Sequence, residues 1–270
     1  MFFVSFYTEG PDIDGCYDLR SVKRQVEKSL SSFFEEMYIF NKSTLKSLPN
    51  SDWVCNEWDE ETEFKNGNLL GYFDFKPFLI DYVLSIVPEN SIVLWHDINF
   101  DKYPSYWQTD WMNLLGLCEE LLSDCSSDFW LRFELNGCFV KNFVKNYTVD
   151  YLIENEVERE VVKNSSLLNC GQIIIRNTST SRELIKEWME LCKNKDLIRI
   201  NPNPNPHPES RLKSCQEQDV LNCLIYKRVL DGRLSPDFPK YNFNWRTLRR
   251  QDRYLQMNES IVNYISQKSS

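Results

Sequence analysis

Asp97 is the residue whose position most clearly suggests chemistry. It follows the short apolar run of residues 92–95, Ile-Val-Leu-Trp, which has the length and composition of a buried strand. Ligands of open α/β sheets collect at the carboxyl ends of strands, so a carboxylate here is a candidate ligand or metal contact. Asn99, two residues further on, adds an amide oxygen, and hard cations such as Mg²⁺ or Mn²⁺ prefer oxygen ligands. The alternative is an aspartate that only caps the end of a strand.

A second candidate, Lys76, lies between an aromatic turn and Pro77. Its ammonium either offsets the charge of a diphosphate, or caps a helix, or lies over the ring of Phe73. Apolar residues recur at three-and-four spacing from residue 78 to 87, which predicts a helix. A proline in the first turn of that helix is favourable.

Two acids open another predicted helix near the C-terminal end. Glu217 and Asp219 precede an apolar stripe that begins at Val220. Ser214 and Glu217 have the spacing of a capping box, which would explain Glu217 without catalysis but leaves Asp219 unexplained. An acid in the first turn is also stabilised by the helix dipole, so both interpretations stay open.

The elements that position these residues predict an α/β fold with a mostly parallel central sheet flanked by helices. Residues 2–7 and 37–40 read as strands, and residues 19–34 carry one apolar stripe of a helix, so the chain opens as β-α-β. Three consecutive isoleucines at residues 173–175 predict a further buried strand, and a helix follows it as far as residue 192. The 270 residues are predicted to form one domain.

In their order and spacing these segments resemble the GT-A family of sugar-nucleotide glycosyltransferases, in particular its small single-domain members from bacteria and large DNA viruses. Residues 71–77, Gly-Tyr-Phe-Asp-Phe-Lys-Pro, match the family pattern G-[YF]-x-x-W-K-P, with Phe75 where tryptophan is usual. Residues 97–99, Asp-Ile-Asn, stand at the DxD position, with Asn99 in place of the second aspartate. Residues 217–218, Glu-Gln, resemble the acid-Gln motif of several GT-A families, in which the acid faces the anomeric centre of the sugar.

The resemblance implies a single GT-A-like domain that moves a sugar from a nucleoside-diphosphate sugar to a carbohydrate acceptor with the help of Mn²⁺ or Mg²⁺. The acid of the late helix would deprotonate the acceptor hydroxyl if the enzyme inverts, or stabilise oxocarbenium-like charge if it retains. Replacement of the second DxD carboxylate by Asn99 weakens the expectation of a metal. The implied site residues are Ser5, Tyr7, Thr8, Tyr72, Lys76 and Asp97 for the donor, Asp97, Asn99 and His207 for the metal, and Glu217 and Asp219 for catalysis.

Composition narrows the other possibilities. The net charge of −9 argues against a nucleic acid partner, which needs basic patches. Nine scattered cysteines, no secretory leader and no transmembrane segment predict a cytoplasmic protein, in the host cytoplasm if the source is viral. Two rivals remain. One is a non-catalytic carbohydrate-binding protein that uses an aromatic surface. The other is a metal-dependent nucleotidyltransferase, although the glycine-rich basic loop usual near its first strand is missing here.

Overall fold

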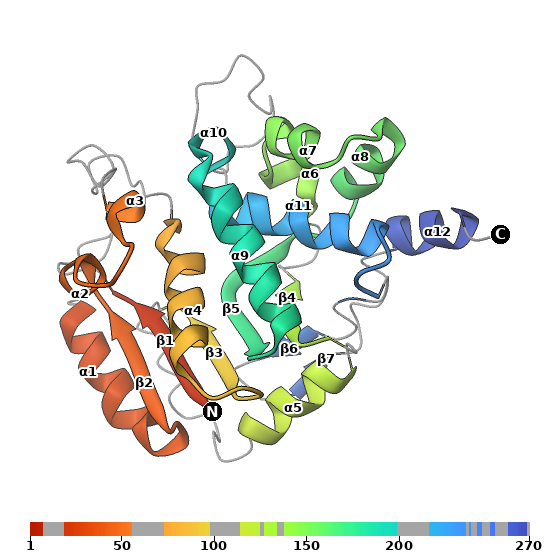
Figure 1. The fold of residues 1–270 in the computed structure, drawn as a ribbon. Coiled ribbons are helices and arrows are strands. Elements are labelled where there is room, and N and C mark those ends of the chain that lie inside the picture. Colours follow the sequence, from red (N-terminus) through yellow and green to blue (C-terminus); the bar gives the residue numbers. More distant parts are fainter. Residues whose placement is uncertain are drawn as a thin grey trace.

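A five-stranded sheet in the order β2-β1-β3-β5-β4 forms the centre of the structure (Figure 1). The structure is a computed structural model that describes residues 1–7, 19–55, 73–97, 114–124, 127–133, 138–198, 216–235, 238, 242–244, 249–251 and 259–268. The strands are β1 (Phe2–Phe6), β2 (Glu36–Phe40), β3 (Ile92–His96), β4 (Phe129–Phe133) and β5 (Leu168–Arg176).

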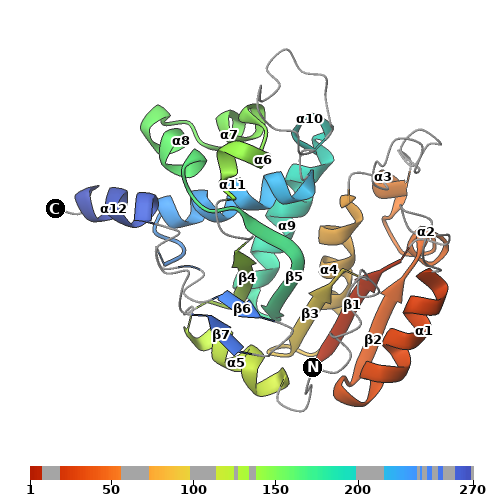
Figure 2. The same cartoon turned by 180° about the vertical axis from the view of Figure 1, so that it is seen from behind.

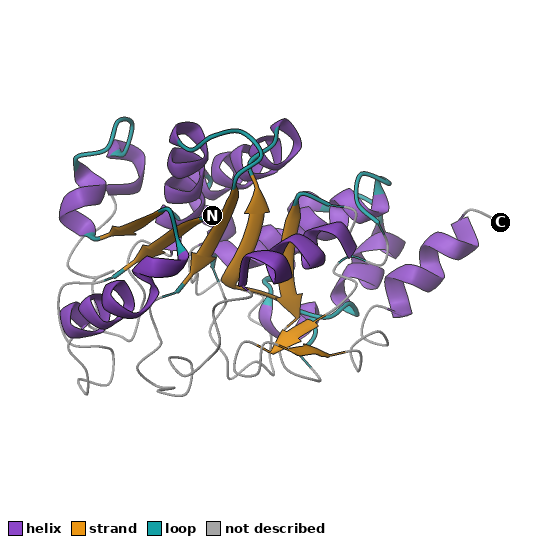
Figure 3. Cartoon of the chain, turned by 90° about the horizontal axis from the view of Figure 1, so that it is seen from below, coloured by secondary structure: helices purple, strands orange, loops and turns teal. Residues whose placement is uncertain are grey.

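Four of these strands run in one direction, and β5 runs in the other. β1 pairs in parallel with β2 and with β3, whereas β5 pairs antiparallel with both β3 and β4. Every residue of β1 and β3 is buried, as expected for central strands that are covered on both faces. Seen from below, helices lie on both sides of the sheet (Figure 3). The prediction of an α/β fold with a mostly parallel sheet flanked by helices is therefore confirmed, and the reversed β5 is an addition to it.

The other elements described complete the chain. They are α1 (Leu19–Leu30), η1 (Ser31–Phe33), α2 (Lys42–Lys46), α3 (Asp52–Cys55), α4 (Phe75–Ile86), α5 (Leu114–Asp124), α6 (Val140–Phe143), α7 (Asn146–Leu152), α8 (Glu156–Lys163), α9 (Ser179–Lys193), α10 (Lys195–Ile198), α11 (Glu217–Leu230), β6 (Asn242–Asn244), β7 (Arg249–Gln251) and α12 (Glu259–Lys268). β6 and β7 form a separate antiparallel pair. Among the residues described, no helix is both long and apolar enough to cross a bilayer.

Helices α4 and α9 cover one face of the sheet, in front of the strands in Figure 1 and behind them in Figure 2. The end of α4 is fixed by Asn177, which follows β5. Its side-chain amide nitrogen donates to the carbonyl oxygens of Leu84, Val87 and Pro88, each at 3.0 Å. Carbonyls at a helix C-terminus have no partner within the helix, so this buried amide satisfies groups that would otherwise be costly. It also fixes α4, and with it Lys76, relative to the sheet.

Helix α11 is fixed to the first half of β5 by two of its own side chains. Asn222 accepts from the backbone nitrogen of Leu168 at 2.8 Å and donates to its carbonyl oxygen at 3.0 Å. One turn earlier, Gln218 accepts from the backbone nitrogen of Cys170 at 3.2 Å. These bonds replace the ladder partners that the start of β5 would otherwise need, and they place the first turn of α11 beside the end of β3.

Candidate active site

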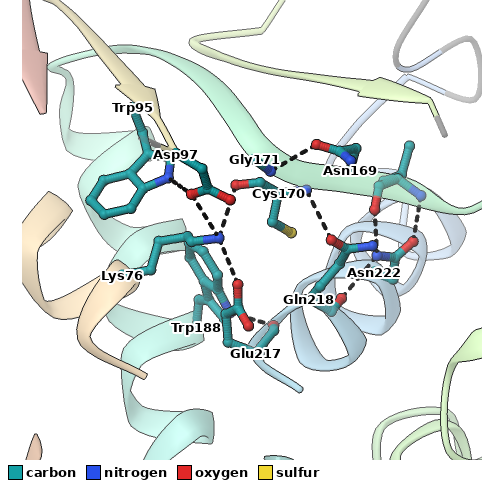
Figure 4. Close-up of polar contacts among 11 residues, drawn as sticks. Lys76, Trp95, Asp97, Asn169, Cys170, Gly171, Trp188, Glu217, Gln218 and Asn222 are labelled. Atoms are coloured by element: carbon teal, nitrogen blue, oxygen red, sulfur yellow. Dashed lines mark hydrogen bonds and ion pairs between the residues drawn. The ribbon is translucent and has the colours of Figure 1, made fainter. Parts of the chain in front are cut away.

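The ammonium of Lys76 lies at the centre of a buried polar cluster (Figure 4). Its Nζ is 2.7 Å from Glu217 Oε1, 3.1 Å from the carbonyl oxygen of Cys170 and 3.4 Å from Asp97 Oδ1. The oxygens of Glu217 and Cys170 lie within hydrogen-bond distance of this ammonium, and Asp97 forms an ion pair with it. The structure thus brings together three of the predicted site residues, which come from α4, the end of β3 and the start of α11.

Asp97 is the member of the cluster that reaches the surface. Its backbone nitrogen donates to the carbonyl oxygen of Gly171 at 2.8 Å and so continues the pairing of β3 with β5. The indole nitrogen of Trp95 donates to Oδ1 at 2.8 Å. The side chain is 33% exposed, and no described residue forms a hydrogen bond with Oδ2. Asp97 therefore presents one carboxylate oxygen that can meet a ligand.

Gly171 leaves the space that this orientation of Asp97 requires. A Cβ atom added to Gly171 would lie 3.2 Å from Asp97 Oδ2 and 2.9 Å from the side-chain oxygen of Asn169. Glycine inside a strand often marks such a close approach.

Glu217 is buried, with 2% of its side chain exposed. Its Oε1 pairs with Lys76, whereas Oε2 is buried without a hydrogen-bond partner among the described residues. Burial raises the pKa of Glu217 to about 8, although the attraction of Lys76 opposes this rise. Burial alone would lower the pKa of Lys76, but Asp97 and Glu217 outweigh it and raise that pKa, so Lys76 stays a cation. The cluster therefore combines a fixed cation with an acid that changes protonation near neutral pH.

Two strained residues precede the helices that supply Lys76 and Glu217. Phe73 has φ 60°, and Gln216, which lies immediately before α11, has φ 58° with ψ −112°. A non-glycine residue in this region is costly and persists only where its surroundings hold it, most often at functional sites. The backbone just before α4 and α11 is therefore held in a strained conformation.

Asp219 lies apart from this cluster. Two residues along a helix turn a side chain by about 200°, so Asp219 and Glu217 face different sides of α11. The buried carboxylate of Asp219 accepts from the backbone nitrogen of Lys145, at the start of α7, at 3.3 Å. This contact ties α11 to α7, and a catalytic role of Asp219 stays a prediction.

The other predicted site residues divide into two groups. Ser5 and Tyr7 have described partners: the Ser5 hydroxyl donates to the carbonyl oxygen of His96 at 2.6 Å, and the Tyr7 hydroxyl accepts from Asn41 at 3.0 Å. Both are buried, and donor contacts from them stay predictions. The remaining predicted residues fall outside the described part of the chain: Thr8, Tyr72, Asn99 and His207.

The capping interpretation of Glu217 is not what the structure shows. Helix α11 begins at Glu217 itself, with Gln216 as its N-cap, and the carboxylate pairs with Lys76. A capping box with Ser214 would require Glu217 to be the third residue of the helix.

The described residues alone do not fit a divalent cation. They contain no group of three or more His, Cys, Asp or Glu side chains that could hold one. Asp97 offers Oδ2, but its other oxygen lies 3.4 Å from the Lys76 ammonium, whose charge repels a cation. A manganese or magnesium site built on Asp97 with Asn99 and His207 remains a prediction.

Several residues that hold the cluster are not among the predicted site residues. Trp188 donates from its indole nitrogen to the carbonyl oxygen of Glu217 at 3.0 Å, and Trp95 orients the carboxylate of Asp97. Gln218 and Asn222 carry a signal that could have been read, because two amides one turn apart interrupt an otherwise apolar helix face. Buried amides of this kind need partners, which here are the backbone of β5.

No protein-family model matches the chain, and no curated protein matches it significantly. Two solved structures of the galactosyltransferase LgtC do. One, in complex with donor and acceptor sugar analogs, is 14% identical over 83% of this chain and 70% of the matched chain, with a TM-score of 0.30. The other, an active-site mutant of LgtC, is 13% identical over the same shares, with a TM-score of 0.31. Likeness at this level does not establish a shared activity, which has to come from the chemistry of the site.

Proposed function

We propose that the chain transfers a sugar from a nucleoside-diphosphate sugar to a carbohydrate acceptor. The observation that carries this proposal is the pairing of a partly exposed carboxylate, Asp97, with a buried acid, Glu217, on the single ammonium of Lys76. The cluster lies at the carboxyl end of β3, where α/β sheets bind ligands.

Glu217 has the properties of the proton acceptor in such a transfer. A general base works best when its pKa lies near the working pH, and the pKa of Glu217 is about 8. In the inverting form of the reaction, the ionised carboxylate takes the proton of the acceptor hydroxyl while that oxygen forms a bond to the anomeric carbon. The bond from the anomeric carbon to the diphosphate breaks, and the leaving diphosphate keeps the electron pair. In the retaining form the same carboxylate would stabilise positive charge at the anomeric centre.

Lys76 acts in this proposal as a positioning residue. Its ammonium pairs with both carboxylates and donates to the carbonyl oxygen of Cys170, so it fixes the position of Asp97 relative to Glu217. Metal assistance through Asp97, Asn99 and His207 is a further prediction, which the comparison with and without Mn²⁺ below tests. Direct contact of Lys76 with the donor diphosphate stays a prediction.

A thermal-shift screen of UDP, GDP, CMP and dTDP sugars, each with and without Mn²⁺, tests the proposal. A donor at 100 times its Kd would stabilise the protein by about 3 kcal/mol, a shift of several degrees. The donor found should then yield a glycosylated acceptor with the wild type and with Glu119→Gln, an exposed control, but not with Glu217→Gln. Stabilisation by none of the nucleotide sugars would refute the proposal. A preference for nucleoside triphosphates would instead favour a nucleotidyltransferase, and sugar binding indifferent to nucleotide and metal would favour a non-catalytic protein.

A further inference from the structure

Two tyrosines on α7 expose an unusual amount of aromatic surface. Tyr147 is 39% exposed and Tyr151 is 52% exposed, and both are among the five large apolar side chains exposed in the described part of the chain. They lie one helical turn apart, with ring centroids 6.2 Å from each other and ring planes inclined by 40°. The two rings thus form one continuous surface on the outer face of the helix.

The helix beneath these rings is firmly held. The hydroxyl of Thr148 donates to the carbonyl oxygen of Leu197 in α10 at 3.0 Å, and Val149 and Leu152 are buried. Asp219 of α11 accepts from the backbone nitrogen of Lys145, just before α7. A ligand that covers the tyrosines would therefore order little of the protein, which favours binding. The same contact connects α7 to the helix that begins with Glu217.

The two exposed rings are small in area compared with a stable protein interface. A tyrosine has about 200 Å² of surface, so the two rings together offer about 180 Å². A specific protein partner covers about 800 Å² on each side. Two inclined rings match the apolar faces of one or two pyranose rings much better.

The charges around the rings select among carbohydrates. Asp150 lies between the two tyrosines in the sequence, is 49% exposed and pairs with Arg159 at 3.7 Å. Glu154, also exposed, follows directly after the helix-capping residue. Carboxylates accept, and a guanidinium donates, hydrogen bonds to sugar hydroxyls. Arg159 offsets the charge of Asp150, so the exposed carboxylate of Glu154 is the group that disfavours anionic chains and anionic membranes.

We infer that Tyr147 and Tyr151 form a binding platform for a neutral oligosaccharide, the part of the acceptor that extends away from the reacting hydroxyl. The identification of this oligosaccharide as the acceptor rests on the proposed function, whereas its binding does not. Each ring should strengthen binding, because aromatic stacking surfaces add affinity beyond simple area burial.

An array of neutral and sialylated oligosaccharides, probed with the labelled full chain without nucleotide or metal, tests the platform. We expect retention on at least one neutral oligosaccharide, an affinity about tenfold lower for Tyr151→Ala, and near wild-type affinity for Tyr151→Phe, which keeps the ring. The matched control is Ile86→Ala, which removes an equally exposed apolar side chain at the end of α4 and should change nothing. Retention on sialylated glycans only, no retention at all, or binding unchanged in Tyr147→Ala and Tyr151→Ala would overturn the inference. So would self-association of the wild type that Tyr151→Ala abolishes, because the rings would then serve a second copy.

The thermal shift caused by nucleotide sugars separates this inference from the proposed function. Tyr147→Ala and Tyr151→Ala should keep the wild-type shift, since neither residue belongs to the Lys76 cluster. Oligosaccharide binding without any nucleotide-sugar shift would leave the platform standing and remove the transferase. A nucleotide-sugar shift without oligosaccharide binding would support the transferase and overturn the platform.

Discussion

Replacing Glu217 with glutamine should change the pH dependence of stability in a defined direction. The carboxyl group has a pKa of about 8 in the folded protein, against 4.5 for an unperturbed glutamate. Between these values the folded state keeps a proton that the unfolded state has released. The free energy of unfolding must therefore fall as the pH rises through this interval. Glutamine has nearly the same shape, cannot ionise, and should remove this part of the pH dependence.

The size of the effect follows from the same two values. One bound proton corresponds to about 1.4 kcal/mol per pH unit, so the wild type should lose a few kcal/mol relative to the variant across the interval, and at most about 5 kcal/mol. Below about pH 4.5 the carboxyl group is protonated in both the folded and the unfolded state, and the difference in stability between wild type and variant should vanish. Above about pH 8 the folded wild type also ionises, and the difference should stop growing. The variant should therefore be the more stable protein at pH 8. Under the proposed function it lacks the general base, so its rate of transfer should fall by about 10²–10⁴.

Urea unfolding of both proteins at half-unit steps from pH 4 to pH 9 measures this difference. All other titrating groups are shared, so subtraction of the two curves isolates Glu217. Glu119→Gln, an exposed glutamate on α5, should give a curve parallel to that of the wild type. Parallel curves for the wild type and Glu217→Gln between pH 5 and pH 8 would refute the reasoning, because they would mean that the carboxyl group is neither desolvated nor displaced in pKa.

Three further substitutions test the geometry of the cluster. Lys76→Met leaves the buried carboxylate of Glu217 without its cation and should lower the free energy of unfolding, measured with urea, by about 3 kcal/mol. This loss should be larger at pH 9 than at pH 5, where Glu217 is protonated. An equal loss at both pH values would contradict the electrostatic coupling between Lys76 and Glu217. Gly171→Ala places a Cβ 3.2 Å from a carboxylate oxygen of Asp97 and should reduce transfer more than stability. The control is Gly116→Ala on α5, where the added atom meets nothing within 4 Å and should stabilise the protein by about 0.5–1 kcal/mol. Similar thermal shifts and activities for the two variants would show that residue 171 does not need to be glycine to accommodate Asp97. Asn222→Ala strands a buried backbone donor and acceptor of β5 and should cost about 3 kcal/mol by thermal unfolding, and a cost below 1 kcal/mol would show that water replaces the amide.

Local patterns were enough to predict most of the strands and helices. The runs at residues 2–7, 37–40 and 92–95 are strands within one or two residues of their predicted ends. The apolar composition of β1 and β3 reflects burial on both faces, whereas β2, at the edge of the sheet, is mostly half-buried. The strand expected at residues 173–175 is longer, Leu168–Arg176, and runs against its neighbours. Strand direction depends on how α6, α7 and α8 return the chain to the sheet, and no local pattern contains that information.

For the candidate site too, local patterns identify the residues, whereas their contacts depend on tertiary packing. The sequence could nominate Asp97, Lys76 and Glu217 one by one, since each stands at the start or end of a predicted element. It could not show that one ammonium joins both acids, because that contact depends on the packing of α4 and α11 against the sheet. The different orientations of Glu217 and Asp219, however, could have been predicted from the sequence. Helical periodicity alone places the side chains of these two acids on different sides of α11.

The position of the Lys76 ammonium between two carboxylates affects how an anionic donor would be bound. With Glu217 protonated, Lys76 and Asp97 leave the cluster close to neutral, and with Glu217 ionised the cluster carries one net negative charge. Neither state offers positive charge to a diphosphate. The charge that compensates a diphosphate must then come from groups beyond these three residues, whereas the cluster itself suits an uncharged hydroxyl that gives up a proton. In the proposed transfer, the acceptor hydroxyl and not the diphosphate would therefore lie next to Glu217.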